Sequence, residues 1–137
     1  MYNKKTQKDK WVKWTSSNID LAGNFYIYEV VYNFKDLKLV LADWDEQDRR
    51  LEVTFLHSYL YRITNESLCV KLEQYLKENY GTVFYQRWSF FVVNNSSYIN
   101  EMGYLNSDKK LIHFVVMGSE SVVDILSEQA PMVTISI

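Results

Sequence analysis

The side chains that build catalytic and metal sites are scarce in this chain. Its 137 residues include one cysteine, two histidines, four glycines and one proline. No HxH, HExxH or CxxC spacing accompanies His57, His113 or Cys69, and each histidine interrupts an apolar strand pattern. Gly103 and Gly118 are isolated, whereas a phosphate-binding loop needs clustered glycines. The sequence therefore predicts no metal site, no cofactor and no catalytic residues, and it predicts that the single Cys69 is a small buried side chain.

Long apolar runs are absent as well. No run approaches the ~18–20 residues that a membrane-spanning helix needs. The first residues, Met1 to Lys5, lead into polar sequence and do not resemble a signal peptide. We therefore expect a cytoplasmic protein with no membrane partner.

Charge is distributed unevenly along the chain, although the net charge is only −2. Residues 1–13 carry five lysines and one aspartate, a net charge of +4, and the remaining residues carry a net charge of −6. The basic segment predicts a flexible tail over 1–13, followed by a single domain over 14–137. Because phosphate binding requires clustered Lys and Arg, the acidic domain argues against nucleic acid as a direct ligand. It suits a basic protein partner.

Aromatic residues are abundant, with 4 Trp, 11 Tyr and 7 Phe. Each buried tyrosine hydroxyl needs a hydrogen-bond partner, so this number of tyrosines predicts that some lie on the surface. Surface tyrosines are common in protein interfaces. An RNA-stacking platform would need basic neighbours, which this acidic domain does not provide. The composition favours a protein that binds over one that catalyses.

Two segments with a two-residue period predict a β-hairpin. Buried and exposed positions are expected to alternate from Leu37 to Leu41 and again from Leu51 to Phe55, on either side of a polar loop. The second segment continues to Ile63, which requires a bend or a bulge near His57.

The period changes at residue 64, where an apolar stripe runs through Leu68, Leu72 and Leu76. This spacing predicts the principal helix at about 66–79, and Gly81 supplies its end. We expect the helix to pack on the sheet face formed by the odd-numbered positions of the hairpin.

Shorter elements complete the pattern. Ser96 can cap a second helical segment near 96–104, and Pro131 keeps the last segment from being a central strand. The remaining strands are expected at 25–32, 83–85, 90–93, 111–117 and 121–126. The predicted fold class is α+β, a mainly antiparallel twisted sheet with the principal helix packed on one face.

Acidic residues surround a tryptophan in the hairpin loop: Asp43, Trp44, Asp45, Glu46 and Asp48. Their spacing lacks the central glycine and the final glutamate of an EF-hand calcium loop. A carboxylate pair for glycoside hydrolysis would need a sugar cleft, which so small a domain rarely builds. Two interpretations remain, a solvated turn and an exposed Trp anchor whose charged rim meets a basic partner. These five residues are the candidate partner-binding site.

The order of these segments resembles small bacterial immunity proteins, the antitoxins of polymorphic-toxin and contact-dependent growth inhibition systems. The resemblance covers residues 25–132. Besides the hairpin and the helix, it rests on Tyr61–Ser67, Asn95–Ile99, His113–Val116, Val123–Ser127 and Ala130–Pro131. It implies a cytosolic protein, expected as a monomer or weak dimer, that binds one cognate toxin domain and blocks its active site or a neighbouring surface. Toxins of this kind are frequently nucleases with basic substrate channels, and the resemblance brings no catalytic residues to this chain.

Two other functions stay open. A sheet and a helix that enclose an aromatic pocket would make a small-ligand-binding domain. An enzyme would instead need distant residues to converge within hydrogen-bond reach, and the candidates are His57, His113, Asp124 and Glu66.

Overall fold

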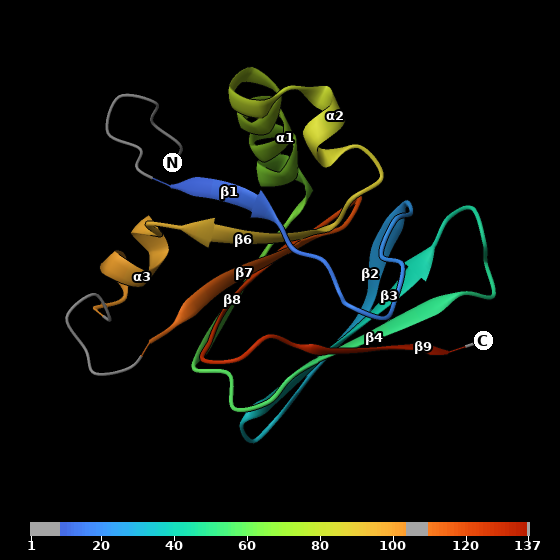
Figure 1. Ribbon diagram of the computed structural model, residues 1–137, viewed down its shortest axis with the longest axis horizontal. Helices are drawn as coiled ribbons and strands as arrows, with labels where there is room; N and C mark the ends of the chain where they lie inside the picture. The colour runs from blue at the N-terminus through green and yellow to red at the C-terminus, as the bar shows by residue number, and fades with distance from the viewer. Residues whose placement is uncertain (1–8, 104–109, 137) are drawn as a thin grey trace.

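The chain folds into two antiparallel β-sheets and one principal helix, with two short helices beside them (Figure 1). This computed structural model describes residues 9–103 and 110–136. The five-stranded sheet has the order β1 (Lys10–Lys13), β6 (Phe90–Asn94), β7 (Ile112–Met117), β8 (Val122–Ser127) and β5 (Leu60–Thr64). The four-stranded sheet has the order β2 (Phe25–Asn33), β3 (Asp36–Asp43), β4 (Arg50–Phe55) and β9 (Met132–Ser136). The helices are α1 (Glu66–Tyr80), α2 (Thr82–Tyr85) and α3 (Ser97–Glu101).

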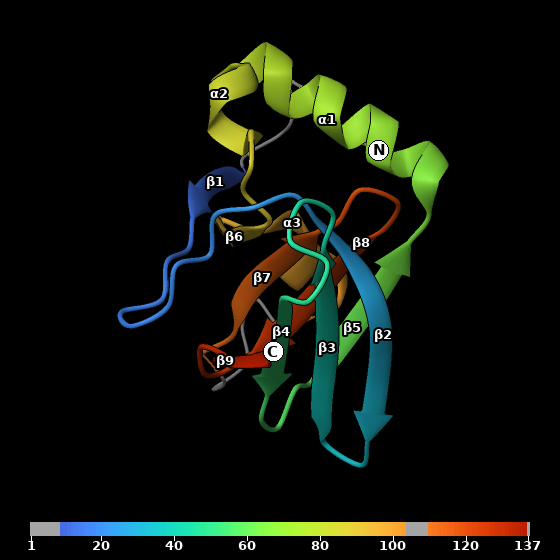
Figure 2. The same cartoon turned by 90° about the vertical axis from the view of Figure 1, so that its right-hand side faces the viewer.

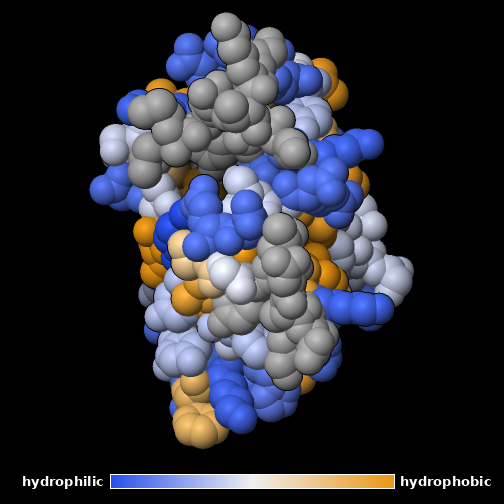
Figure 3. Space-filling view, turned by 90° about the vertical axis from the view of Figure 1, so that its left-hand side faces the viewer, coloured by the Kyte–Doolittle hydropathy of each residue, from blue (hydrophilic) through white to orange (hydrophobic). Residues whose placement is uncertain are grey.

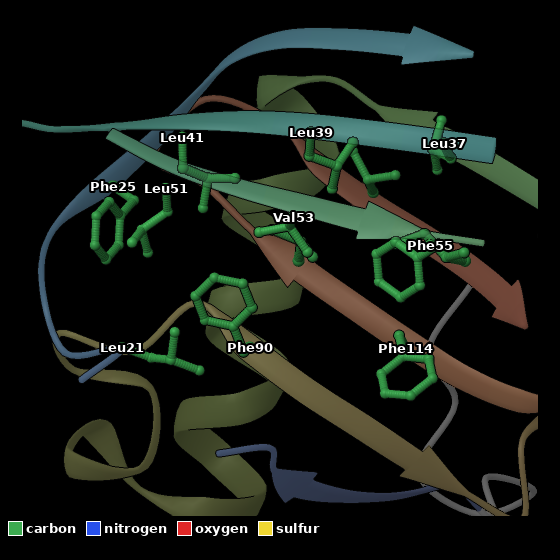
Figure 4. Close-up of a cluster of buried hydrophobic side chains, with 13 residues drawn as sticks. Leu21, Phe25, Leu37, Leu39, Leu41, Leu51, Val53, Phe55, Phe90 and Phe114 are labelled. Carbon is green, nitrogen blue, oxygen red and sulfur yellow. The ribbon is translucent and has the colours of Figure 1, made fainter. Parts of the chain in front are cut away.

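The predicted hairpin is confirmed as β3 and β4. Leu37 pairs with Phe55, Leu39 with Val53 and Leu41 with Leu51, and all six side chains are buried. They face the five-stranded sheet, whose inward side chains include Phe90 and Phe114 (Figure 4). The rings of Phe55 and Phe114 lie 5.4 Å apart across this interface. The two sheets therefore form a sandwich, and the larger of the two core clusters lies between them.

The principal helix is confirmed, but its expected packing against the hairpin is wrong. Leu72 and Leu76 of α1 pack with Trp11 and Phe91 on the other face of the five-stranded sheet. Figure 1 shows α1 on the side of β6 away from β4 and β9. The reason is that β7 and β8 are buried on both faces, so their sheet is the middle layer. The side chain of Leu68, the first member of the expected stripe, lies outside the described residues.

Three further expectations need correction. The segment 83–85, expected as a strand, forms α2. Residues 10–13, expected in the flexible tail, form β1 at the edge of the five-stranded sheet because Trp11 is buried there. The expected bend near His57 is present, with a left-handed φ of 55° at this residue, but the segment does not continue in one sheet, because β4 and β5 belong to different sheets.

Several local expectations are confirmed. Cys69 is buried on α1, and Gly81 ends this helix with a positive φ of 89°. Ser96 caps α3, where its Oγ accepts a hydrogen bond from the Ile99 N–H. Pro131 precedes β9, which is an edge strand.

The four-stranded sheet turns its other face outward. Figure 2 shows β2 and β3 at the front of the molecule, while α1 lies above them. Tyr28 is 63% exposed and Val31 is also exposed on this face of β2. The guanidinium of Arg50 lies 5.6 Å from the Tyr28 ring on this face. Exposed Tyr32 is on the opposite face, where it pairs with Leu37 and its ring lies 5.3 Å from the Tyr61 ring of the five-stranded sheet. The composition predicted surface tyrosines, and Tyr28 and Tyr32 of β2 are two of them.

Candidate functional site

The hairpin loop between β3 and β4 is organised by Asp43. Its carboxylate is buried and its Oδ1 accepts hydrogen bonds from the backbone N–H groups of Asp45 at 2.8 Å and Glu46 at 3.3 Å. Its Oδ2 lies 3.4 Å from the Arg49 guanidinium. Asp43 was expected on the rim of a binding surface, but it lies beneath the loop. Its role is to shape the loop that presents the neighbouring residues.

Trp44 projects from this loop with 51% of its area exposed. Its ring lies 4.5 Å from the ring of Tyr26 on β2, and its indole N–H donates a hydrogen bond of 3.1 Å to the Ser119 hydroxyl. Its backbone N–H donates to the Asn24 carbonyl. The side chain is therefore fixed before any partner arrives. A large apolar group that is already ordered loses less conformational entropy on binding.

The remaining acids differ in their surroundings. Asp45 accepts hydrogen bonds from Asn24 at 2.8 Å and from Arg87 at 3.0 Å. Two hydrogen bonds hold the pKa of the Asp45 carboxyl below its usual value. The larger cause is the hydrogen bond from Asn24, and the next is that from Arg87. Glu46 and Asp48 are exposed, and no ion pair within the described ranges involves either one. The acidic residues exposed around Trp44 are thus Glu46 and Asp48, together with the paired Asp45.

Four residues that support this loop were not found from the sequence: Asn24, Tyr26, Arg87 and Ser119. They come from distant segments and meet the loop only in the folded chain. Arg87 stands out because it has a left-handed φ of 55°, which is uncommon for a residue with a side chain. Nothing in the linear pattern marks this conformation.

Two shallow clefts adjoin the loop, and both are open to solvent. One, of about 150 Å³, lies beside Trp44 and is lined also by Tyr85, Arg87 and Trp88. The other, of about 460 Å³, lies under the loop between Glu46 and Ile135. Neither encloses a small molecule in the way that a typical ligand pocket does.

A buried chain of hydrogen-bonded polar side chains lies between α3 and the strands β5, β7 and β8 of the five-stranded sheet. The Ser96 Oγ is 2.7 Å from His113 Nδ1, and His113 Nε2 is 2.7 Å from Asp124 Oδ1. The other carboxylate oxygen of Asp124 binds the Arg62 guanidinium at 3.1 Å. The Tyr98 ring lies 5.2 Å from the His113 ring and 4.2 Å from the Arg62 guanidinium carbon. Burial raises the pKa of the Tyr98 hydroxyl.

Serine, histidine and aspartate in this order resemble a catalytic triad, but three features differ. The serine meets Nδ1 and the aspartate meets Nε2, the reverse of the arrangement in serine proteases. The Ser96 hydroxyl is committed as the cap of α3. Neither cleft described above reaches Ser96 or His113, and both residues are buried. The arrangement satisfies polar groups between α3, β7, β8 and β5.

The other residues considered for an enzyme do not join this chain. His57 is exposed between β4 and β5, where its backbone N–H donates to Asp36. The side chain of Glu66 lies outside the described residues. Within the part of the chain that the structure describes, no three His, Cys, Asp or Glu side chains gather into a possible metal site. The face of the molecule toward α3 shows mainly hydrophilic residues with smaller apolar areas between them (Figure 3).

Comparisons of this chain with protein families, with curated proteins and with solved structures gave no match. Over the described residues, no helix is both long enough and apolar enough to cross a membrane.

Proposed function

We propose that this chain is an immunity protein that acts in the bacterial cytoplasm by binding and neutralising a basic toxin domain. The binding surface is the Trp44 surface, which comprises Tyr26, Trp44, Asp45, Glu46 and Asp48. The observation that carries the proposal is the half-exposed, immobilised Trp44 with acids around it.

The chemistry of this surface supports a protein partner. Aromatic anchors near the centre of an interface carry much of its binding energy, and the surrounding charges steer association. Glu46 and Asp48 would attract a basic surface, and the net charge of −6 over residues 14–137 acts in the same direction. A toxin with a basic substrate channel has the complementary charge. The open form of both clefts argues against the alternative of an enclosed small-ligand site.

The proposal predicts that a neighbouring gene encodes a toxin domain, and that domain is the partner to test. Purified chain added in equimolar amount should form a stable complex and abolish the toxin's activity, and co-expression should protect cells. If the chain neither binds the domain nor protects the cells, the proposed function is wrong. A chain in which Trp44 is replaced by Ala should protect less well than one in which exposed Phe34, at the other end of β2, is replaced by Ala.

The alternative of an enzyme can be tested at Ser96, although its hydroxyl is buried and caps α3. The Ser96 hydroxyl is within hydrogen-bond distance of His113, which in turn contacts Asp124. A fluorophosphonate probe with the intact protein provides the test. Covalent labelling at Ser96, lost in the Ser96→Ala variant, would support a hydrolase. Absence of labelling, together with a marked loss of stability in the same variant, would show that the hydrogen bonds among Ser96, His113 and Asp124 have a structural role.

A further inference from the structure

We propose that the cleft beside Trp44 holds the guanidinium group of an arginine from the partner protein. This inference rests on the proposed function and specifies which group of the partner the surface recognises. The cleft measures about 150 Å³ and is lined by side chains from five separate segments, among them Trp44, Glu73, Tyr85, Arg87 and Trp88.

Aromatic rings make the cleft suitable for a flat cation. Tyr26 contacts Trp44 at 4.5 Å and fixes the indole, whose ring also lines the cleft. Tyr85 and Trp88 contribute further rings. A guanidinium group is planar and weakly hydrated, so it stacks on aromatic faces better than a lysine ammonium does.

The same fold already places cations over neighbouring rings. Arg49 lies 5.3 Å from the Phe25 ring, and Lys13 lies 5.7 Å from the Trp88 ring. Among the described residues, no such cation contact involves Trp44, so its half-exposed side chain remains available to an incoming cation.

The charges at the cleft favour a cation. Arg87 lines the cleft, but its guanidinium is paired with Asp45 at 3.0 Å. Glu73, on the exposed side of α1, also lines the cleft and makes no ion pair within the described ranges. Glu120 is exposed and follows Ser119, the residue that accepts the Trp44 hydrogen bond. The unpaired charge of the lining is therefore the Glu73 carboxylate, which can accept a charge-assisted hydrogen bond from arginine.

The experiment is an NMR titration of the isotope-labelled full chain with N-acetyl-arginine amide. N-acetyl-citrulline amide, which has nearly the same shape without the charge, is the matched control ligand. The arginine probe should produce saturable shifts of the Trp44 indole N–H and of the Gly118 and Ser119 amides, and the citrulline probe should not. Glu73→Gln should weaken binding of the arginine probe by roughly twofold to thirtyfold. Glu78→Gln, which changes an exposed acid elsewhere on α1, should leave it unchanged.

Three results would overturn the inference. Equal shifts from arginine and citrulline would show that charge is not recognised. Shifts only from N-acetyl-glutamate amide would show that Arg87 makes the cleft an anion site. Unchanged arginine binding in Glu73→Gln would place the cation elsewhere.

The inference and the proposed function fail separately. If the arginine probe does not bind while Trp44→Ala still weakens the toxin complex, only the cleft inference is wrong. If the probe binds as expected and no toxin complex forms, the proposed function is wrong and the cleft remains a guanidinium site.

Discussion

The ring of Tyr26 lies 4.5 Å from the ring of Trp44, so a strand and a loop share one surface. Surface tyrosines and the acidic loop were separate features of the sequence, and in the structure half-buried Tyr26 of β2 contacts Trp44 of the loop. Their contact joins the loop to the outer face of the four-stranded sheet. A partner that buries Trp44 therefore also meets the end of β2, which enlarges the available interface.

The position of α1 leads to a first prediction about stability. Leu72 is 2% exposed between α1 and the five-stranded sheet. Leu72→Ala should lower the free energy of unfolding by about 2–5 kcal/mol, because the substitution removes apolar contacts and leaves a cavity. Urea denaturation measures this change. Val70→Ala, on the exposed side of the same helix, should be nearly neutral, and equal losses for the two variants would contradict the packing described above.

Asp43 gives a second prediction, because it supports the loop from below. Asp43→Ala removes the acceptor of two backbone hydrogen bonds and the partner of Arg49, and it should cost about 1–3 kcal/mol in unfolding free energy. Asp48→Ala changes an exposed acid in the same loop and is the control. The account of the loop is wrong if both variants unfold at the same urea concentration.

A third prediction concerns the ionisation of Asp45. Its pKa is lowered in the folded state, so the stabilisation it provides is complete above the ordinary pKa of about 3.9. That stabilisation is lost as the pH falls through the lowered pKa. An NMR titration of the side-chain carboxyl should show the low pKa directly. Asn24→Ala should raise the pKa of Asp45 more than Arg87→Met does, because the Asn24 hydrogen bond is the larger cause. The reverse order would contradict the assignment.

The buried polar chain yields a fourth prediction. Ser96→Ala removes the cap of α3 and leaves His113 Nδ1 without this partner. The expected loss of unfolding free energy is about 1–3 kcal/mol. Ser17→Ala, at an exposed position in the loop before β2, should change it by less than about 0.5 kcal/mol. A Ser96→Ala variant as stable as the native protein would show that the chain of hydrogen bonds is dispensable for folding.

Local patterns predicted the individual elements well. The hairpin period, the stripe of α1 and the cap at Ser96 depend on residues close in sequence. The hairpin and the cap are confirmed, and the stripe is confirmed at Leu72 and Leu76. The partner of each apolar face depends on pairing between distant strands, and for this reason α1 was placed against the wrong layer. The segment 83–85 was misassigned because a short apolar run fits a strand and a helical turn equally well.

Contacts between distant segments also limited what the sequence could predict about the candidate site and the buried polar residues. Trp44 and its acids were visible as a cluster in one loop. The contact between Asp45 and Arg87 joins residues 42 positions apart, and that between Ser96 and His113 joins residues 17 apart. Such pairs follow from the fold and not from any spacing in the sequence.

The central claim is that Trp44 anchors a protein partner, and the dissociation rate of the toxin complex tests it most directly. Loss of a buried aromatic anchor typically costs about 2 kcal/mol or more, so Trp44→Ala should speed dissociation about thirtyfold. Phe34→Ala, which removes an exposed aromatic at the opposite end of β2, should leave the rate unchanged. A dissociation rate for Trp44→Ala equal to that of the native chain would contradict the account.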